Sequence, residues 1–447
     1  MSEREHAGEA SQTLPKPAVR KPSLRRSLLM FFSIIGPGII TANADNDVGG
    51  ITTYSLAGAQ FGYTMLWLLI PVTIALIVTQ EMCARMGAVT GKGLADLIRE
   101  NFGVKITTIV LLLFVLGDLG NTAAEFAGIA SAAPIFQSYA PSAIAPFLSK
   151  FVMVPVLAFL VFTAVTRGNY KIVERIFFFF CTVYLAYVVS GIMVHPNWHE
   201  VFTATLVPHF TPTSAYLVTA IGVIGTTISP WMQFYIQSAV VEKGIRVKEY
   251  GYSRLDVISG ALITDVIAYF IVVASAATIF IHNAHLGSGQ TPITINDAGD
   301  VAAALAPLAG KYASLLFALG LLNAAIFTAS ILPLSTAYYV CEAFGFESGV
   351  ERRFSEAPVF YALYLSLIVV GAGFVLIPGA PLLGTIFYSQ VLNGALLPIV
   401  LFLMLLLINN RKLMGPYVNG VIFNTIAWAT ILIVGVLTII SIFTLSP

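Results

Sequence analysis

Two carboxylates, Asp45 and Asp47, lie in the middle of the first long apolar stretch of the chain. A charged side chain at membrane depth costs roughly 3 kcal/mol on insertion scales, so an acid in such a stretch indicates a functional site. Gly49 and Gly50 follow directly, and each glycine weakens a helix interior by about 1 kcal/mol. An acid beside a weakened helix is typical of ion-binding sites in transporters, where unwound carbonyls join the carboxylate as ligands.

The composition indicates a membrane protein. Hydrophobic residues make up 57% of the 447 positions and charged residues 10%, against about 25% charged residues in a soluble domain. Residues 1–26 are polar, and we expect a disordered cytoplasmic tail there and a single transmembrane domain over 27–447. The basic cluster from Arg20 to Arg26 is expected to contact anionic headgroups of the lipid bilayer, and we expect no nucleic-acid partner.

Eleven apolar segments are long enough to span a bilayer, which requires about 20 residues. They cover roughly 27–56, 64–88, 105–133, 149–166, 173–194, 214–240, 256–282, 311–343, 357–378, 382–409 and 417–445. With the N-terminus inside, 21 of the 23 Lys and Arg residues fall in cytoplasmic segments, and only Lys150 and Lys311 do not. The positive-inside rule therefore predicts a multi-pass protein of the cell membrane with a cytoplasmic N-terminus and an extracellular C-terminus.

The sixth segment carries a second interruption, because Pro230 removes a backbone donor and clashes with the preceding turn. Two interrupted helices five segments apart predict an inverted repeat of five plus five helices, with an eleventh helix appended. We place the first repeat at about 27–194, the second at about 214–409 and the extra helix at about 417–445.

Several motifs in order along the chain resemble those of the Nramp divalent-metal transporters. Gly36-Pro37-Gly38 ends nine residues before Asp47, and Gln60-Phe61-Gly62-Tyr63 closes the segment at the family spacing. Residues 83–96 resemble the loop after helix two, and Ser389-Gln390-Val391 and 411–415 also fit. The resemblance covers most of the chain. It implies an all-α polytopic membrane protein of the LeuT-type fold, in agreement with the predicted repeat.

The sequence departs from the family pattern where the ion is expected. The helix-one motif Asp-Pro-Gly-Asn of the family reads Asp47-Val48-Gly49-Gly50 here, so the acid is kept and the amide ligand is lost. In helix six, Ser229 replaces the methionine of the family and Trp231 replaces its histidine. This pattern resembles the divergent Nramp-related magnesium transporters.

The remaining ligands suit a hard cation. Methionine sulfur favours thiophilic ions and oxygen favours Mg²⁺, Ca²⁺ and Mn²⁺, so Ser229 removes the discrimination against alkaline-earth ions. Gly50 in place of asparagine is expected to enlarge the cavity and admit a partly hydrated ion, since Mg²⁺ usually keeps several waters. We therefore predict a transported Mg²⁺ held chiefly by Asp47, with Mn²⁺ also carried. The expected metal-site residues are Asp47, Gly50, Thr226, Ser229, Gln390, Asn43, Ala44 and Thr227, with backbone carbonyls near Ala44 and Thr226.

Several of these residues have an alternative structural role. Thr226, Thr227 and Ser229 are also of the kind that cap a broken helix or bond its carbonyls. Gln390 would serve equally well in a helix–helix hydrogen bond. Asn43 lies four residues before Asp47 on the same helical face, which makes it a candidate outer-shell group.

Groups that the family associates with proton movement are missing. Trp231 cannot titrate, Asn121 replaces the glutamate that pairs with Asp118 in helix three, and 354–378 has no arginine. Asp118 and Glu125 remain, and a structural polar network is the alternative role for both. We predict uniport without protons, because a potential of 100 mV adds roughly 4–5 kcal/mol for a dication.

The sequence alone leaves two other functions open. One is a proton-coupled Mn²⁺/Fe²⁺ transporter of the ordinary Nramp kind, and the other is an Na⁺-coupled organic solute symporter of LeuT-type fold. No nucleophile–base pair or zinc pattern is visible, so an enzyme is not expected. We expect no cofactor and a functional monomer.

Overall fold

The computed structural model describes residues 37–167, 184–285, 292–293, 295, 299–305, 310–350 and 352–445, and within these ranges the regular structure is helical, with no strand. The helices are α2 (Pro37–Asp45), α3 (Val48–Phe61), α4 (Leu66–Thr90), α5 (Leu94–Tyr139), α6 (Lys150–Arg167), α8 (Leu185–Met193), α9 (Trp198–Leu206), α10 (Ser214–Thr227), α11 (Pro230–Glu242), α12 (Tyr250–Ser275), α13 (Ile281–Ala284), α15 (Ala313–Phe344), α16 (Pro358–Leu376), α17 (Leu382–Ile408), α18 (Arg411–Met414) and α19 (Val421–Leu445). Short 3₁₀ segments and a π-helical turn, Ala276–Phe280, join some of them.

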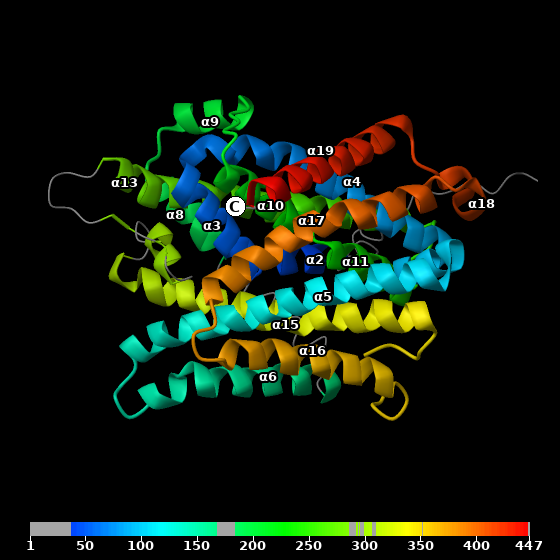
Figure 1. Cartoon of the computed structure of the whole chain (residues 1–447), viewed down its shortest axis with the longest axis horizontal. Helices are drawn as coiled ribbons and strands as arrows, with labels where there is room; N and C mark the ends of the chain where they lie inside the picture. The colour runs from blue at the N-terminus through cyan, green and yellow to red at the C-terminus, as the bar shows by residue number, and fades with distance from the viewer. Residues whose placement is uncertain are drawn as a thin grey trace, which may run out of the picture.

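The long helices lie side by side and cross the molecule along its longest axis (Figure 1). Eight helical stretches of the described chain have the length and apolar composition of a membrane span, and α6 is a shorter apolar helix. This confirms a multi-pass membrane protein. The predicted tail 1–26, the first part of segment one and the first half of the fifth segment, 173–194, fall outside the described residues. In the second half of the fifth segment the chain forms α8.

Both predicted interruptions are present. α2 ends at Asp45 and α3 begins at Val48, so two residues, Asn46 and Asp47, separate the halves of the first span. α10 ends at Thr227 and α11 begins at Pro230, which occupies the first turn, where its missing N–H costs no helical hydrogen bond. The two broken helices face each other, since α3 packs on α10 and α2 packs on α11.

Long neighbouring helices hold the two broken helices in place. α12 packs along both α2 and α3, while α17 packs against α3 and α10. α5 and α15 form an extensive pair in the lower half of Figure 1, next to α16 and α6. Both interruptions therefore lie inside the bundle, where unpaired backbone groups can serve a bound ion.

The third span begins close to the predicted residue, but a separate short helix precedes it. We expected it over 105–133, whereas α5 begins at Leu94 and contains a sharp bend at Gly103 with φ 80° and ψ 167°. A glycine adopts this conformation without the steric penalty of a Cβ. The residues before the bend form a separate short helix that buries Leu94, Leu97 and Ile98.

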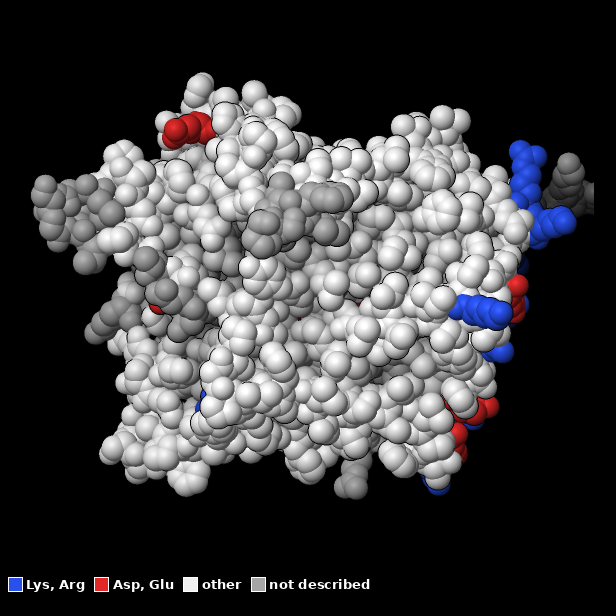
Figure 2. Space-filling view, viewed as in Figure 1, with Lys and Arg blue, Asp and Glu red and all other residues white. Residues whose placement is uncertain are grey.

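Charged side chains are concentrated at one end of the molecule. Figure 2 shows Lys and Arg gathered at the end that carries α18, with Arg411 and Lys412, and a broad uncharged middle. This distribution along the long axis agrees with a membrane band flanked by one basic side. Which side of the membrane that end faces stays a prediction.

Candidate metal site

Asp47 begins the second half of the first broken helix. Its carboxylate Oδ1 accepts a hydrogen bond of 2.6 Å from the backbone N–H of Gly50, so Asp47 is the N-cap of α3. The residue is 4% exposed. A carboxylate has two oxygens with about four lone-pair sites, so capping leaves acceptor capacity for a cation. Its place at a helix N-terminus also stabilises the ionised form that a metal requires.

The second broken helix brings two hydroxyl groups to the break. The Thr226 hydroxyl is buried and has no hydrogen-bond partner. A Cβ built on Gly50 would lie 3.4 Å from both Thr226 Oγ1 and Asp47 Oδ1, so these three residues meet. Ser229 is the N-cap residue of α11, and its hydroxyl donates to the Gly225 carbonyl at 2.8 Å. Ser229 thus satisfies a carbonyl of the broken helix while its oxygen lone pairs remain acceptors.

Gly50 has a different role from the one expected. A Cβ at this position would lie 2.6 Å from the Asp45 carbonyl oxygen. The missing side chain therefore leaves no void on that side, and glycine instead lets the unwound segment fold back against the start of α3. Gly49 is similarly covered, because a Cβ there would lie 1.9 Å from Nε2 of Gln390.

Gln390 reaches the break and takes part in an amide network that the sequence did not reveal. Asn393, one turn further along α17, donates through Nδ2 to Gln390 Oε1 at 3.0 Å, to Asn121 Oδ1 at 3.0 Å and to Ser229 Oγ at 3.3 Å. Asn121 donates back to Asn393 Oδ1 at 2.9 Å. The network ties α5, α17 and the second break together. Asn121 of α5 bonds across to Asn393 of α17, whereas the bond between Gln390 and Asn393 lies within α17.

Glu125 is the second acid of the site. It is fully buried on α5, and neither carboxylate oxygen has a hydrogen-bond partner. Glu125 lies close to Asp47 and to the backbone N–H of Val48, without a hydrogen bond of normal geometry to either. Helix α5 packs closely on the start of α3, because a Cβ on Gly128 would lie 2.4 Å from Cγ2 of Val48. This close packing brings Glu125, one turn before Gly128, to the break. In the sequence, Glu125 was recognisable as a charged residue at membrane depth, one turn after Asn121.

The remaining predicted residues lie beside the break or are already bonded. The Ala44 carbonyl accepts from Thr328 Oγ1 at 3.4 Å. Thr227 donates to the Val223 carbonyl at 2.8 Å and shares a 2.6 Å hydrogen bond with the Tyr54 hydroxyl, which is the structural alternative for this residue. Asn43 belongs to α2, but its side chain lies outside what the structure describes.

Asp118 and Trp231 have partners of their own. Asp118 Oδ2 accepts from Thr336 Oγ1 at 2.7 Å and from Tyr339 Oη at 2.8 Å, which binds α5 to α15. Trp231 is buried in an apolar cluster with residues of α2, α11 and α15: Ile40, Ala44, Met232, Tyr235, Phe327, Ile331 and Leu332. The position of the family histidine is therefore part of an apolar cluster here.

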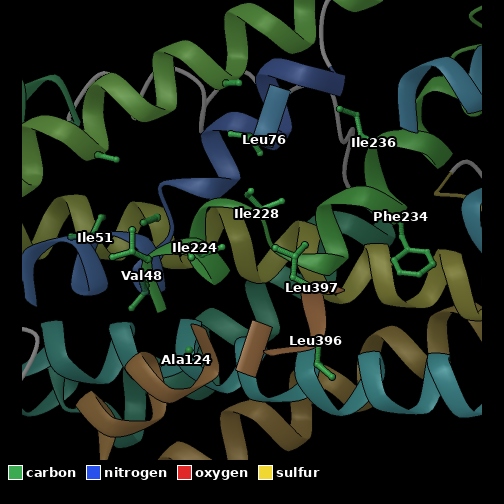
Figure 3. Packing of buried hydrophobic residues seen from close by; sticks show 14 of the residues in the cluster. Val48, Ile51, Leu76, Ala124, Ile224, Ile228, Phe234, Ile236, Leu396 and Leu397 are labelled. Carbon is green, nitrogen blue, oxygen red and sulfur yellow. The ribbon is translucent and has the colours of Figure 1, made fainter. Parts of the chain in front are cut away.

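Apolar side chains surround the two breaks. Val48 and Ile51 of α3, Ile224 of α10 and Ile228 between α10 and α11 are fully or nearly fully buried and lie together (Figure 3). Such a dry shell strengthens the interaction between a cation and the acids. It also makes the two carboxylates costly when no cation is bound.

Comparison with known proteins identifies the family. Residues 38–444 match the family profile described as natural resistance-associated macrophage protein-like, Nramp. The chain belongs to the Nramp family. It is 28% identical over 430 residues to the divalent metal cation transporter MntH of Ralstonia nicotianae, covering 92% of this chain and 90% of that relative.

Solved structures agree with the Nramp assignment at the level of the fold. A crystal structure of the manganese transporter of Eremococcus coleocola superposes with a TM-score of 0.70 at 20% identity, covering 96% of this chain and 91% of that chain. MhsT in complex with L-phenylalanine superposes with a TM-score of 0.57 at 14% identity, covering 91% and 98%. The predicted all-α LeuT-type fold is thus confirmed.

Glu125→Gln is expected to lower the apparent affinity for divalent ions by about tenfold or more, the lower end of the effect of altering groups around a bound metal. The substitution removes one of the two buried negative charges of the candidate site and keeps the side-chain volume. Initial rates of Mn²⁺ uptake into proteoliposomes over a range of concentrations measure the change. Glu100→Gln on the same helix, which removes the exposed ion pair with Lys92, is the matched control. Equal affinities for Glu125→Gln and the control would exclude Glu125 from the site.

Proposed function

We propose that this Nramp protein transports divalent metal ions across the membrane, with Mg²⁺ as its main substrate and Mn²⁺ also carried. One observation carries the proposal: Asp47 and Glu125 face each other, buried, where the two broken helices meet. A dication neutralises both charges. The printed name of the Ralstonia relative, a divalent metal cation transporter, supports the same class of substrate.

The chemistry of the donors favours a hard ion. Asp47, Glu125 and the Thr226 hydroxyl offer oxygen, which suits Mg²⁺ and Mn²⁺. Met232, the methionine nearest to Ser229 along the chain, packs in the apolar cluster around Trp231. With two carboxylates and neutral oxygens, the site resembles the sites in which Mg²⁺ keeps part of its water.

Transport without proton coupling follows from the groups around the site. Trp231 replaces a titratable residue with an apolar ring, and Asn121 is hydrogen-bonded to Asn393 and cannot carry a proton as an acid would. α16 contains no basic residue. A membrane potential that is negative inside then drives the dication inward.

Proteoliposomes that enclose a Mg²⁺ indicator and a pH dye test both parts of the proposal. With an inside-negative potassium diffusion potential, external Mg²⁺ should enter without acidification of the lumen, and Mn²⁺ should enter likewise. A protonophore should leave the initial Mg²⁺ rate unchanged, and liposomes without protein set the leak. Mn²⁺ influx accompanied by acidification, with no Mg²⁺ flux, would establish the proton-coupled alternative instead.

A further inference from the structure

Asp45 and Asp265 are two further acids inside the membrane domain, and neither is used by the site described above. Asp45 is the last residue of α2 and is 1% exposed, while Asp265 lies in the middle of α12 and is 6% exposed. No hydrogen bond of normal geometry reaches either oxygen of either carboxylate, although the Thr73 hydroxyl of α4 lies near Asp265. Buried carboxylates normally have donors or a cation, so four unpaired oxygens point to a ligand.

The packing of α12 on α2 brings these acids together. Thr264, the residue before Asp265, donates to the Ala42 carbonyl at 2.5 Å. A Cβ on Gly260 would lie 2.7 Å from the Gly38 carbonyl oxygen, so the two helices are in close backbone contact. Asp265 is accordingly the acid that acts most strongly on Asp45, ahead of Asp47.

Further oxygens lie near these two acids. Both Asp45 and Asp265 act electrostatically on the hydroxyl of Tyr54. Ser55, whose buried hydroxyl has no partner, lies one turn before Gly58, which packs on the Val272 carbonyl of α12. Carboxylates with hydroxyl and phenol oxygens form a hard donor set.

No cation of the described protein neutralises this pair. The ion pairs there join Arg85 with Glu81, Lys92 with Glu100 and Arg352 with Glu347, and none of them includes Asp45 or Asp265. By comparison, Asp256 on the same helix accepts the backbone N–H of Gly38 at 2.7 Å. Asp256 thus accepts a backbone hydrogen bond that Asp265 lacks.

We propose that Asp45 and Asp265 form a second binding site for a divalent cation, beside the first site. A dication balances the two charges, which a monovalent ion would leave half compensated. Two neighbouring dications repel each other, and multi-site occupancy of this kind lets bound ions leave a site that would otherwise hold them. The binding proposal does not depend on transport by Asp47.

Binding stoichiometry of Mn²⁺ tests the second site. The purified full-length protein in nanodiscs is titrated with Mn²⁺ alone, and the free ion is counted by electron paramagnetic resonance. The wild type should bind two ions, and Asp265→Asn and Asp47→Asn should each bind one. Asp256→Asn is the matched control, because its amide oxygen still accepts from Gly38, and it should bind two.

Different outcomes separate the two proposals. One bound ion in the wild type that is lost in Asp47→Asn and kept in Asp265→Asn would overturn the second site and leave the first. One ion lost in Asp265→Asn and kept in Asp47→Asn would do the reverse. If Asp265→Asn fails to elute as a single species on size exclusion, Asp45→Asn replaces it and should also bind one ion; two ions in that variant would overturn the proposal.

Discussion

Transport of every divalent ion should be lost when Asp47 is replaced by alanine, with initial Mg²⁺ and Mn²⁺ rates in proteoliposomes reduced by about 100-fold or more. Changes in groups that only support a metal ligand already cost roughly 10- to 100-fold in metal affinity, and Asp47 is placed to contact the ion itself. The substitution also removes the cap of α3, for which about 1 kcal/mol of stability is expected. The loss of transport and the loss of stability both follow from removing one carboxylate at the break.

Asp47→Asn separates the two consequences. Asparagine caps a helix about as well as aspartate, so this variant should retain the thermal unfolding temperature of the wild type while its transport falls nearly as far as in Asp47→Ala. Asp256→Asn, a buried acid outside the site, should transport normally. Substantial Mg²⁺ flux through Asp47→Asn would remove the negative charge of Asp47 from the mechanism.

Much of the architecture was predictable because membrane helices have strong sequence signals. Length, hydropathy and the distribution of basic residues gave the spans, and Gly49, Gly50 and Pro230 marked both interruptions. The start of α5 was missed because its first helix, before Gly103, is amphipathic and too polar to count as a span. The boundaries of the two repeats remain predictions.

The composition of the site was less predictable because it depends on contacts between distant helices. Asp47 was recognisable from its own surroundings, whereas Glu125 becomes a partner only through the close packing of Gly128 on Val48. Asn393 carries no charge and sits in an apolar helix, so nothing local singled it out. Its position one turn after Gln390 was the one available hint.

Gly50 lies at the break, as predicted, but the role that the sequence suggested for it is incomplete. The sequence suggested that the missing side chain enlarges the cavity, but the Asp45 carbonyl occupies the space next to its Cα. An asparagine at this position would first have to displace the backbone of the break. Ion selectivity is therefore better tested at Ser229, where a side chain is already present and the helix begins.

Ser229→Met is expected to raise the preference for Mn²⁺ over Mg²⁺ by about tenfold or more, a difference of about 1.4 kcal/mol. A thioether is a soft ligand that binds Mn²⁺ better than Mg²⁺ and binds Cd²⁺ better still. The longer side chain must also displace the contact between Ser229 Oγ and Asn393. Methionine is flexible enough to fit an irregular space. The ratio of initial Mn²⁺ and Mg²⁺ rates, and inhibition of Mg²⁺ uptake by Cd²⁺, measure the change.

The effect of sulfur is distinguished from the effect of size by Ser229→Leu. Leucine has nearly the volume of methionine and exchanges with it at low cost in buried positions, but it offers no ligand atom. We expect this variant to lower both rates together and to remain insensitive to Cd²⁺. If Ser229→Leu shifts the Mn²⁺ preference as far as Ser229→Met, the side chain at 229 acts through volume and not as a ligand. Hardness of the donor set, which underlies the choice of Mg²⁺ as substrate, would then have to come from Asp47 and Glu125 alone.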